Sequence, residues 1–209
     1  MSVRWLLSAV SLCLLPGTLL ADEWAFEVSL DQKKIGTHVF KLENGHLSSR
    51  ADFNVKVLFI SAYRYQHQAE EDWQDGCLQQ LQAHTVENRE VTDVSGQLQG
   101  SQFVVMKQEK RQTLPSCVMT FAYWNPAMLK QSQLLNPQNA EFLDITVSDT
   151  GSKRIVVRGE ALNASEYHLT GRFQGKSKLN ITLWYDQNQR WVGLKSITPE
   201  GYVVSYKLI

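Results

Sequence analysis

The residues best suited to acid–base chemistry lie in one short stretch of the chain. Tyr63, Tyr65 and His67 alternate along one side of an expected strand, and Glu71 and Asp72 follow closely. A histidine beside a carboxylate can transfer protons in a cleft. The alternative is a strand that leaves the core and continues into a solvated acidic loop. We favour the loop, because closeness in sequence does not place these groups in contact. We therefore assign no catalytic residue.

Other motifs for catalysis or metal binding are missing from the sequence. The five histidines show no compact metal spacing such as HExxH. The chain also lacks GxSxG and a glycine-rich phosphate loop. We expect neither a metal nor a cofactor.

The N-terminus has the layout of a secretory signal peptide. Arg4 precedes an almost wholly apolar run over residues 5–15, and Ala21 ends the segment before two acidic residues. The run is shorter than the roughly 20 residues that a membrane-spanning helix needs. We expect a signal peptide over residues 1–21, cleaved near Ala21, with no stable membrane anchor.

Two of the three cysteines, Cys77 and Cys117, lie in the expected mature chain, and Cys13 lies in the leader. In an oxidising compartment such a pair most often forms a disulfide. Their wide separation excludes a compact zinc motif, and a catalytic thiol beside a second free cysteine would be easily oxidised. We predict a structural disulfide that contributes about 4 kcal/mol in the chain-entropy account.

Aromatic side chains are the remaining candidates for a binding site. They could line an apolar ligand cavity inside a barrel, although aromatic residues also pack well on any pleated sheet. The residues that we expect to contact such a ligand are Tyr63, Tyr65, Trp73, Trp124 and Trp184.

The elements that must position these side chains are strands. Apolar and polar residues alternate over 24–30, and Asn44-Gly45 is a strong hairpin signal. The alternation over 53–65 is unusually long, which fits one bent strand or two strands broken near 58–60.

The C-terminal third repeats this pattern. It predicts strands over 143–147 and 155–157, separated by a turn at 149–151, and further strands separated by turns at 186–189 and 199–201. Short strands with frequent turns favour an antiparallel sandwich or barrel.

Few segments suit a helix. Asn125 could cap a short helix near residues 126–132, with Pro126 in its first position. The segment 70–83 is ambiguous, because its leucines fit a helix whereas Asp75-Gly76 fits a turn.

Composition limits the class of protein. The 209 residues include 21 Lys and Arg against 21 Asp and Glu, and 43% are hydrophobic. The zero net charge argues against broad nucleic-acid binding. We expect an all-β fold: an antiparallel meander over residues 22–209 that forms a single open or half-closed β-barrel.

Several segments resemble a family of uncharacterised exported proteins of Gram-negative bacteria, a domain of unknown function. The resemblance lies in the opening strand pair FEVSLDQKKIG, in the block DGCL around Cys77, and in LPSCVMTFAYW around Cys117. One turn departs from the family pattern, because Arg89 stands where a glycine is usual. The resemblance implies a periplasmic, sheet-rich single domain, and it supplies no activity.

Our leading hypothesis is a non-enzymatic periplasmic protein that binds an apolar ligand or lipid in a curved sheet. One alternative is a hydrolase-like or isomerase-like enzyme with a His67/Glu71 acid–base pair. Another is a module that binds an envelope protein through an exposed strand.

Overall fold

The structure is a computed structural model that describes residues 21–57 and 60–209. Residues 1–20, which carry nearly all of the expected signal peptide, and residues 58–59 lie outside the described residues. Within the described part of the chain, no helix is long and apolar enough to cross a membrane.

Fourteen antiparallel strands form one sheet, which confirms the predicted all-β meander. The strands are β1 (Asp22–Leu30), β2 (Lys33–Glu43), β3 (His46–Val57), β4 (Ile60–Gln74), β5 (Cys77–Glu87), β6 (Glu90–Gln99), β7 (Gln102–Lys107), β8 (Lys110–Pro115), β9 (Gln133–Leu135), β10 (Phe142–Val157), β11 (Glu160–Phe173), β12 (Lys176–Tyr185), β13 (Trp191–Ile197) and β14 (Val203–Leu208).

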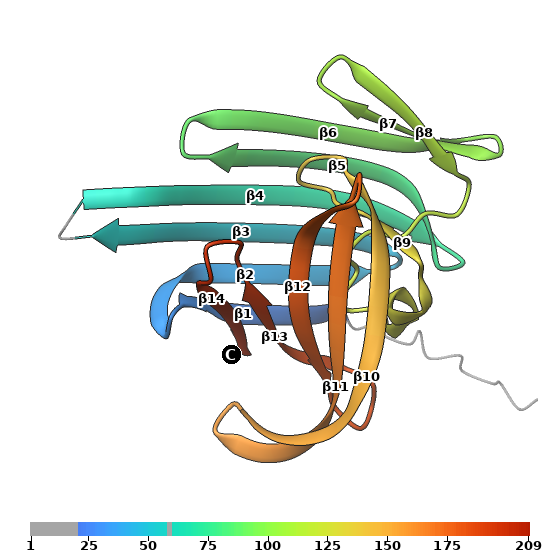
Figure 1. Ribbon diagram of the computed structural model, residues 1–209. Coiled ribbons are helices and arrows are strands. Elements are labelled where there is room, and N and C mark those ends of the chain that lie inside the picture. Colours follow the sequence, from blue (N-terminus) through green and yellow to red (C-terminus); the bar gives the residue numbers. More distant parts are fainter. Residues whose placement is uncertain (1–20, 58–59) are drawn as a thin grey trace, which may run out of the picture.

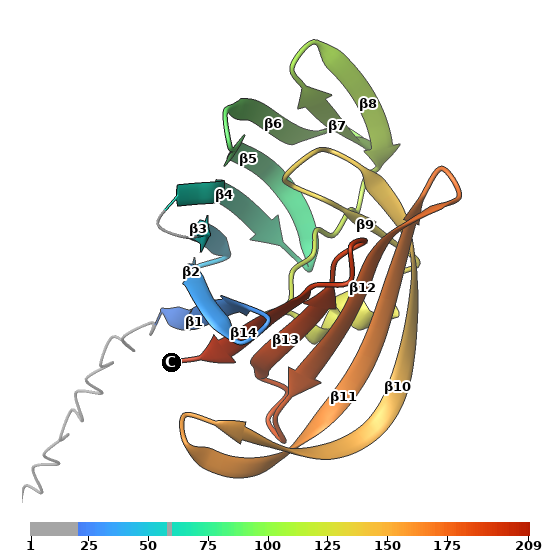
Figure 2. The same cartoon turned by 60° about the vertical axis from the view of Figure 1, so that its left-hand side comes forward.

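The sheet is curved and open. Strand β1 pairs with β14 near the middle, and the strand order runs outward from there to the two edge strands, β8 and β9. The half formed by β1–β8 and the half formed by β10–β13 curl toward each other (Figures 1 and 2). Apolar side chains from both halves meet between them, where Phe26, Leu183 and Trp191 are almost fully buried.

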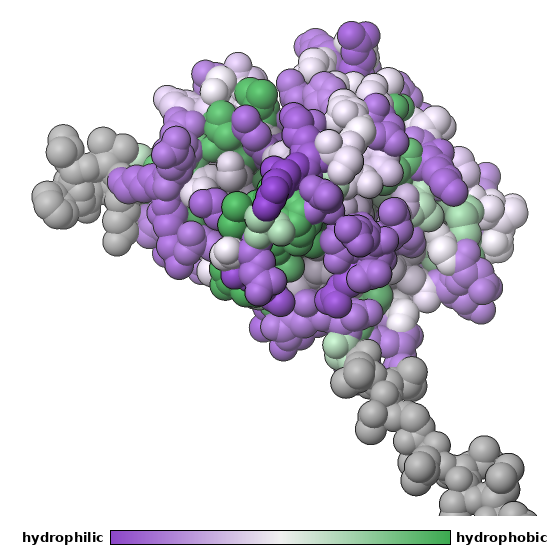
Figure 3. Space-filling model, turned by 90° about the horizontal axis from the view of Figure 1, so that it is seen from below, coloured by the Kyte–Doolittle hydropathy of each residue, from purple (hydrophilic) through white to green (hydrophobic). Residues whose placement is uncertain are grey.

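A long hairpin extends beyond the rest of the sheet. The far ends of β10 and β11 form it, and at the bottom of Figure 1 it curves round toward the last residues of β14. Seen from that side, apolar side chains gather near the centre of the molecular face, with hydrophilic side chains around them (Figure 3).

One irregular segment, residues 116–132, leads from edge strand β8 toward edge strand β9. Main-chain hydrogen bonds hold it on both sides: Leu78 N donates to Val118 O at 3.0 Å, and Leu135 N donates to Met119 O at 2.9 Å. Its buried apolar side chains belong to the same core clusters as those of the sheet. We call residues 116–132 the crossing segment.

The crossing segment contains the predicted short helix. It is a single 3-10 helix, η1 (Pro126–Lys130), and the Asn125 side chain accepts a hydrogen bond from Ala127 N at 3.0 Å. This confirms the expectation near residues 126–132. The 3-10 helix ends at Lys130, because the next residue, Gln131, has an extended backbone.

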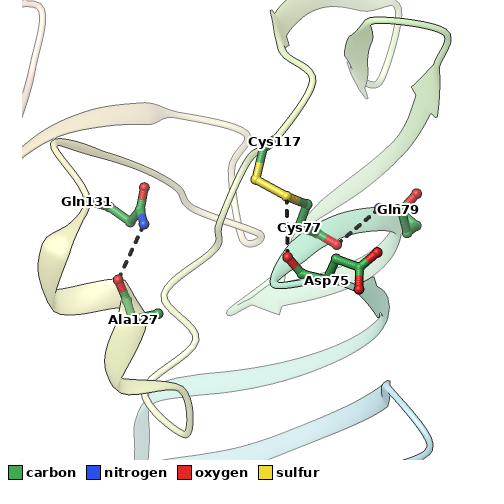
Figure 4. Close-up of a disulfide and its surroundings, with 6 residues drawn as sticks. All are labelled: Asp75, Cys77, Gln79, Cys117, Ala127 and Gln131. Carbon is green, nitrogen blue, oxygen red and sulfur yellow. Dashed lines mark hydrogen bonds between the residues drawn. A yellow bond between two sulfur atoms is a disulfide. The ribbon is translucent and has the colours of Figure 1, made fainter.

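The predicted disulfide joins Cys77 at the start of β5 to Cys117 at the start of the crossing segment (Figure 4). The bond closes a sequence separation of 40 residues. It therefore fixes the point where the crossing segment leaves the sheet.

Several local predictions are confirmed. Asn44-Gly45 forms a hairpin turn in which both residues have positive φ, as such two-residue turns require. Asp75-Gly76 does the same between β4 and β5, so the ambiguous segment 70–83 is two strands rather than a helix. The long alternation over 53–65 belongs to two strands, β3 and β4.

The prediction of a turn at 149–151 is wrong. Strand β10 continues through it with a register shift between Asp149 and Gly151, and the chain turns only at Arg158-Gly159. The Asp149 side chain accepts a hydrogen bond from Gly151 N at 2.8 Å, and Gly151 has a φ of 89°. These features are typical of a bulge as well as of a turn.

Candidate functional site

A cavity of about 140 Å³ lies between the concave face of β2–β4 and the crossing segment. Strand side chains form one wall, and the crossing segment and the loop after β9 form most of the other, with Leu179 of β12. The lining residues are His38, Phe40, Leu47, Ser49, His67, Ala69, Glu71, Thr120, Phe121, Ala122, Tyr123, Trp124, Asn136, Pro137, Gln138 and Leu179.

The cavity exists because small side chains coincide across neighbouring strands. Ser49 of β3 pairs with Ala69 of β4, which pairs with Ala83 of β5. The larger Phe40 lies opposite Ser49 on β2. Directly paired residues point to the same face of a sheet. The row of small side chains therefore leaves a hollow that Phe40 borders on one side.

Glu71 is a buried carboxyl group at one end of this hollow. Its Oε2 accepts hydrogen bonds from Trp73 Nε1 at 3.0 Å and from Thr120 Oγ1 at 3.2 Å. Only 3% of the residue is exposed, and burial raises the pKa of Glu71 to about 7, although both hydrogen bonds lower it. The group is therefore poised to change charge near neutrality.

His67 lies at the other end of the hollow. Its Nδ1 is 2.9 Å from Thr85 Oγ1, and burial lowers the pKa of His67 to about 4. His67 and Glu71 are four residues apart on one strand, which is about 13 Å along the strand axis. Each has its own hydrogen-bond partners. The structure therefore brings both to one cavity but does not join them as a direct acid–base pair.

A second buried histidine belongs to the same wall. His38 stacks on Phe40, with ring centroids 4.0 Å apart, and its Nε2 is 2.8 Å from Ser49 Oγ. Its Nδ1 is 3.2 Å from Tyr206 Oη. Burial lowers the pKa of His38 to about 3, so the imidazole is neutral at pH 7.

Two of the predicted aromatic residues meet at the Glu71 end. Trp73 and Trp124 pack edge to face, with ring centroids 5.6 Å apart, and Trp124 lines the cavity. The indole Nε1 of Trp124 is buried and has no hydrogen-bond partner among the described residues. It is a buried donor without a partner in the described part of the chain, in a side chain that lines the cavity.

The other predicted aromatic residues lie elsewhere. Tyr65 stacks on Phe53 at 5.2 Å in a separate cluster, against which Tyr63 also packs. Trp184 projects from the opposite face of β12 to the core residues Leu183 and Tyr185, and its Nε1 donates to Glu166 Oε2 at 2.9 Å.

The charged residues next to the predicted pair point away from the cavity. Arg64 is exposed, and Asp72 is 2.7 Å from His46 Nδ1 on the outer face of the sheet. Alternation along β4 explains both positions, since His67 and Glu71 have the opposite parity.

Sequence reasoning missed the parts of the site that depend on register. Ser49 and Ala69 create the hollow, and Thr120 holds Glu71 from the crossing segment. The only available signal was the presence of small residues at core-facing positions of two strands, and their coincidence could not be seen without the pairing.

The walls of the cavity are chemically mixed. Among the described residues, no three His, Cys, Asp or Glu side chains are grouped so that they could hold a metal ion. The cavity combines aromatic walls, neutral imidazoles, a carboxyl group that can be neutral or charged and an unpaired indole N–H. Such walls hold an apolar group and offer hydrogen bonds at its ends.

Comparisons with known proteins agree with the fold. The profile of a family described as "Domain of unknown function (DUF6134)" matches residues 26–209. A crystal structure of a "Beta-barrel-like Protein of Domain of Unknown Function DUF1849 from Brucella abortus" is similar, with a TM-score of 0.68 and 11% sequence identity. The similarity covers 91% of this chain and 96% of that one. No curated protein sequence matches significantly.

Proposed function

The chain belongs to the family described as a domain of unknown function, DUF6134, and from that premise we propose that it is a non-catalytic binding protein of the periplasm. It would hold the apolar part of a small ligand between the concave face of β2–β4 and the crossing segment.

The size and walls of the cavity carry this proposal. An apolar cavity of about 150 Å³ engineered into another protein binds benzene. The 140 Å³ cavity therefore has room for an apolar group of about six carbons. Phe40, Trp124 and Leu179 would contact that group. A longer alkyl chain would have to extend through the opening.

Polar groups at the Glu71 end define the rest of the ligand. A buried donor without a partner costs about 1–3 kcal/mol, so a ligand oxygen that accepts from Trp124 Nε1 would be favoured. Oε1 of Glu71 takes no part in the hydrogen bonds to Trp73 and Thr120. A ligand hydroxyl could accept from the indole and donate to this oxygen.

Location in the periplasm is part of the proposal. The disulfide Cys77–Cys117 is typical of exported proteins, and the N-terminal sequence has the layout of a signal peptide. Both observations support export, and cell fractionation would test it directly.

The test uses 1-hexanol as a probe, which has six carbons and one hydroxyl group. Titration of isotope-labelled protein should shift the Trp124 indole N–H resonance, with a Kd on the order of 1 mM from the burial of the methylenes. Ala69→Leu should abolish the shift by filling the hollow. Ala62→Leu, at an exposed position of the same strand, is the matched control and should bind as the wild type does.

Either of two results would count against the proposal: no shift of the Trp124 signal in folded wild-type protein, or equal binding by the Ala69→Leu variant. Native mass spectrometry of protein purified from periplasm complements this test, since a co-purified amphiphile would identify the natural ligand class.

A further inference from the structure

A second concavity lies on the opposite side of the sheet from the cavity described above. The turn of the β10–β11 hairpin bends back toward β13 and β14, where Arg158 Nε and Nη2 donate to the main-chain oxygen of Ile209 at 3.1 and 2.7 Å. A groove of about 520 Å³ lies between the hairpin and these strands. This volume lies within the range of roughly 300–1,000 Å³ that is usual for small-molecule sites. We call it the hairpin groove.

Strand register explains the floor of the hairpin groove. Gly193 of β13 lies between Trp184 of β12 and Lys207 of β14 in one cross-strand row. Gly193 has no side chain, so the row is low between the indole and the lysine, and we call this part the trough. Gly193 is itself buried, and Cε3 of Trp184 lies 3.4 Å from the position that a Cβ would take. The hydrogen bond from Trp184 to the buried Glu166 holds the indole in place.

The walls of the hairpin groove are apolar and partly open to solvent. Ile209 is 57% exposed, and the half-buried Ile155, Val157 and Leu208 also line the groove. Val156, which is 70% exposed, alternates with Ile155 and Val157 and so points to the opposite face of the hairpin. The face that contains the hairpin shows apolar side chains near its centre (Figure 3). Exposed apolar residues grouped around one groove mark a binding surface more often than scattered ones do.

The rim of the hairpin groove is positively charged although the whole chain is neutral. Its lining includes the cations Arg158, Lys195 and Lys207 and one acidic side chain, Glu27. Arg158 already donates to Ile209. Glu27 forms an ion pair with Lys34 at 2.8 Å and lies directly across from Lys207, so it offsets part of that lysine's charge. Lys195 pairs with Ser205, so it is a diagonal neighbour of Lys207 on the same face. Diagonal neighbours are about 7–8 Å apart, which lets two lysines reach one anionic group.

We propose that the hairpin groove binds a single anionic amphiphile, such as a long-chain carboxylate. The alkyl chain lies over Gly193, between Trp184 and the hairpin, and the anionic head group contacts Lys195 and Lys207. This site is separate from the cavity at Glu71 and takes a longer chain. The apolar walls and the local excess of positive charge select this ligand over a cationic or purely polar one.

The first test is titration calorimetry with dodecanoate below its micellar concentration. Each added methylene from octanoate to dodecanoate should strengthen binding about fourfold, as burial of a methylene predicts. Dodecyltrimethylammonium, with the same chain and the opposite charge, should bind at least tenfold more weakly. Equal affinity for the two head groups, or no dependence on chain length, would overturn the proposal.

Variants then locate the site. Gly193→Leu should abolish dodecanoate binding by filling the trough; a Cβ there meets its nearest neighbours at an ordinary 3.4 Å, and no positive φ forbids a side chain. The double variant with Lys195→Gln and Lys207→Gln should weaken dodecanoate binding about tenfold. This variant should fold even if the Gly193→Leu variant does not. The matched control is Lys107→Gln with Lys110→Gln on β7 and β8, which should change nothing.

The same titration separates this proposal from the function proposed for the cavity. Ala69→Leu, which fills the cavity, should leave dodecanoate binding intact. Loss of dodecanoate binding in Ala69→Leu with retention in Gly193→Leu would place the chain in the cavity and overturn the hairpin-groove site.

Discussion

On the concave face of β4, His67 and Glu71 lie on either side of Ala69, so two titratable side chains face one cavity without forming a pair with each other. Burial shifts their pKa values in opposite directions, to about 4 for the histidine and about 7 for the carboxyl group. Both are therefore predominantly neutral between about pH 5 and 6.5. Above neutrality Glu71 becomes a buried anion without a cationic partner among its hydrogen-bond contacts.

This buried carboxyl group predicts a specific pH dependence of stability. The pKa of Glu71 is higher in the folded state than the ordinary value of 4.5, so the folded protein binds the proton more tightly. The resulting stabilisation is fully present below pH 4.5 and is lost as pH rises to about 7, a change of about 3 kcal/mol. Glu71→Gln should therefore match the wild type at low pH and exceed its free energy of unfolding by about this amount at pH 8.

Denaturant titrations of wild type and Glu71→Gln at pH 5 to 8.5 would measure this difference. Gln can still accept the hydrogen bonds from Trp73 and Thr120, so packing is preserved in the comparison. A stability difference that is the same at every pH would show that Glu71 titrates without a burial penalty.

His38 predicts the opposite slope in acid. Burial holds its pKa at about 3, below the ordinary 6.5, so the unfolded chain binds a proton that the folded protein excludes. The folded state therefore loses stability as pH falls from 6.5, by about 3 kcal/mol at pH 4. His38→Gln should remove this loss, so its acid unfolding transition should have a smaller dependence on pH.

Ser49→Ala is the matched control for His38→Gln. It removes the hydrogen bond to His38 Nε2 without removing a titratable group. We expect it to lower the free energy of unfolding by about 1 kcal/mol with little change of slope. The explanation from His38 fails if the His38→Gln variant keeps the full acid sensitivity of the wild type.

The strands were predictable because their signals are local. The alternation that places Trp24, Phe26 and Val28 in the core identifies strand β1. Asn44-Gly45 identifies the turn between β2 and β3, because these two residues adopt the positive φ that such a turn requires. The disulfide was predictable because two cysteines remain after the expected signal peptide and the expected compartment is oxidising. By contrast, Asp149 and Gly151 carry the same local signal in a bulge as in a turn, and only the pairing of β10 with β11 distinguishes them.

The candidate site could be predicted only in part, since it depends on residues far apart in sequence. Glu71 and Trp124 were recognised as chemically suitable, but Thr120, which donates to Glu71, comes from 49 residues away. Trp184 was grouped with Trp124 because both are aromatic, whereas strand parity places it on the opposite face. Local sequence patterns show which face of its strand a side chain occupies, but they do not show which residue lies beside it on the neighbouring strand.

The disulfide should stabilise the attachment of the crossing segment. Replacing both Cys77 and Cys117 by alanine removes a cross-link over 40 residues, which predicts a loss of about 4 kcal/mol. Reductant should destabilise the wild type but not the variant. Hydrogen exchange should accelerate most at the Leu78 amide, which donates to Val118 O beside Cys117. Unchanged stability and unchanged exchange at Leu78 would show that packing alone holds the segment.

Close packing at Gly96 gives a prediction about the core of the β5–β8 region. A Cβ at Gly96 would lie 2.5 Å from Cε1 and 2.8 Å from Cζ of the fully buried Phe103 ring. Gly96→Ala should therefore cost about 1–3 kcal/mol by overpacking. Phe103→Leu alone should also destabilise by leaving a void, but the two changes together should cost less than their sum, with a coupling of about 1 kcal/mol.

Gly193→Ala is the matched strand control, because its Cβ would meet neighbours at 3.4 Å, and it should change stability by less than about 0.5 kcal/mol. Additive effects of Gly96→Ala and Phe103→Leu in denaturant titrations would mean that the ring moves aside without strain.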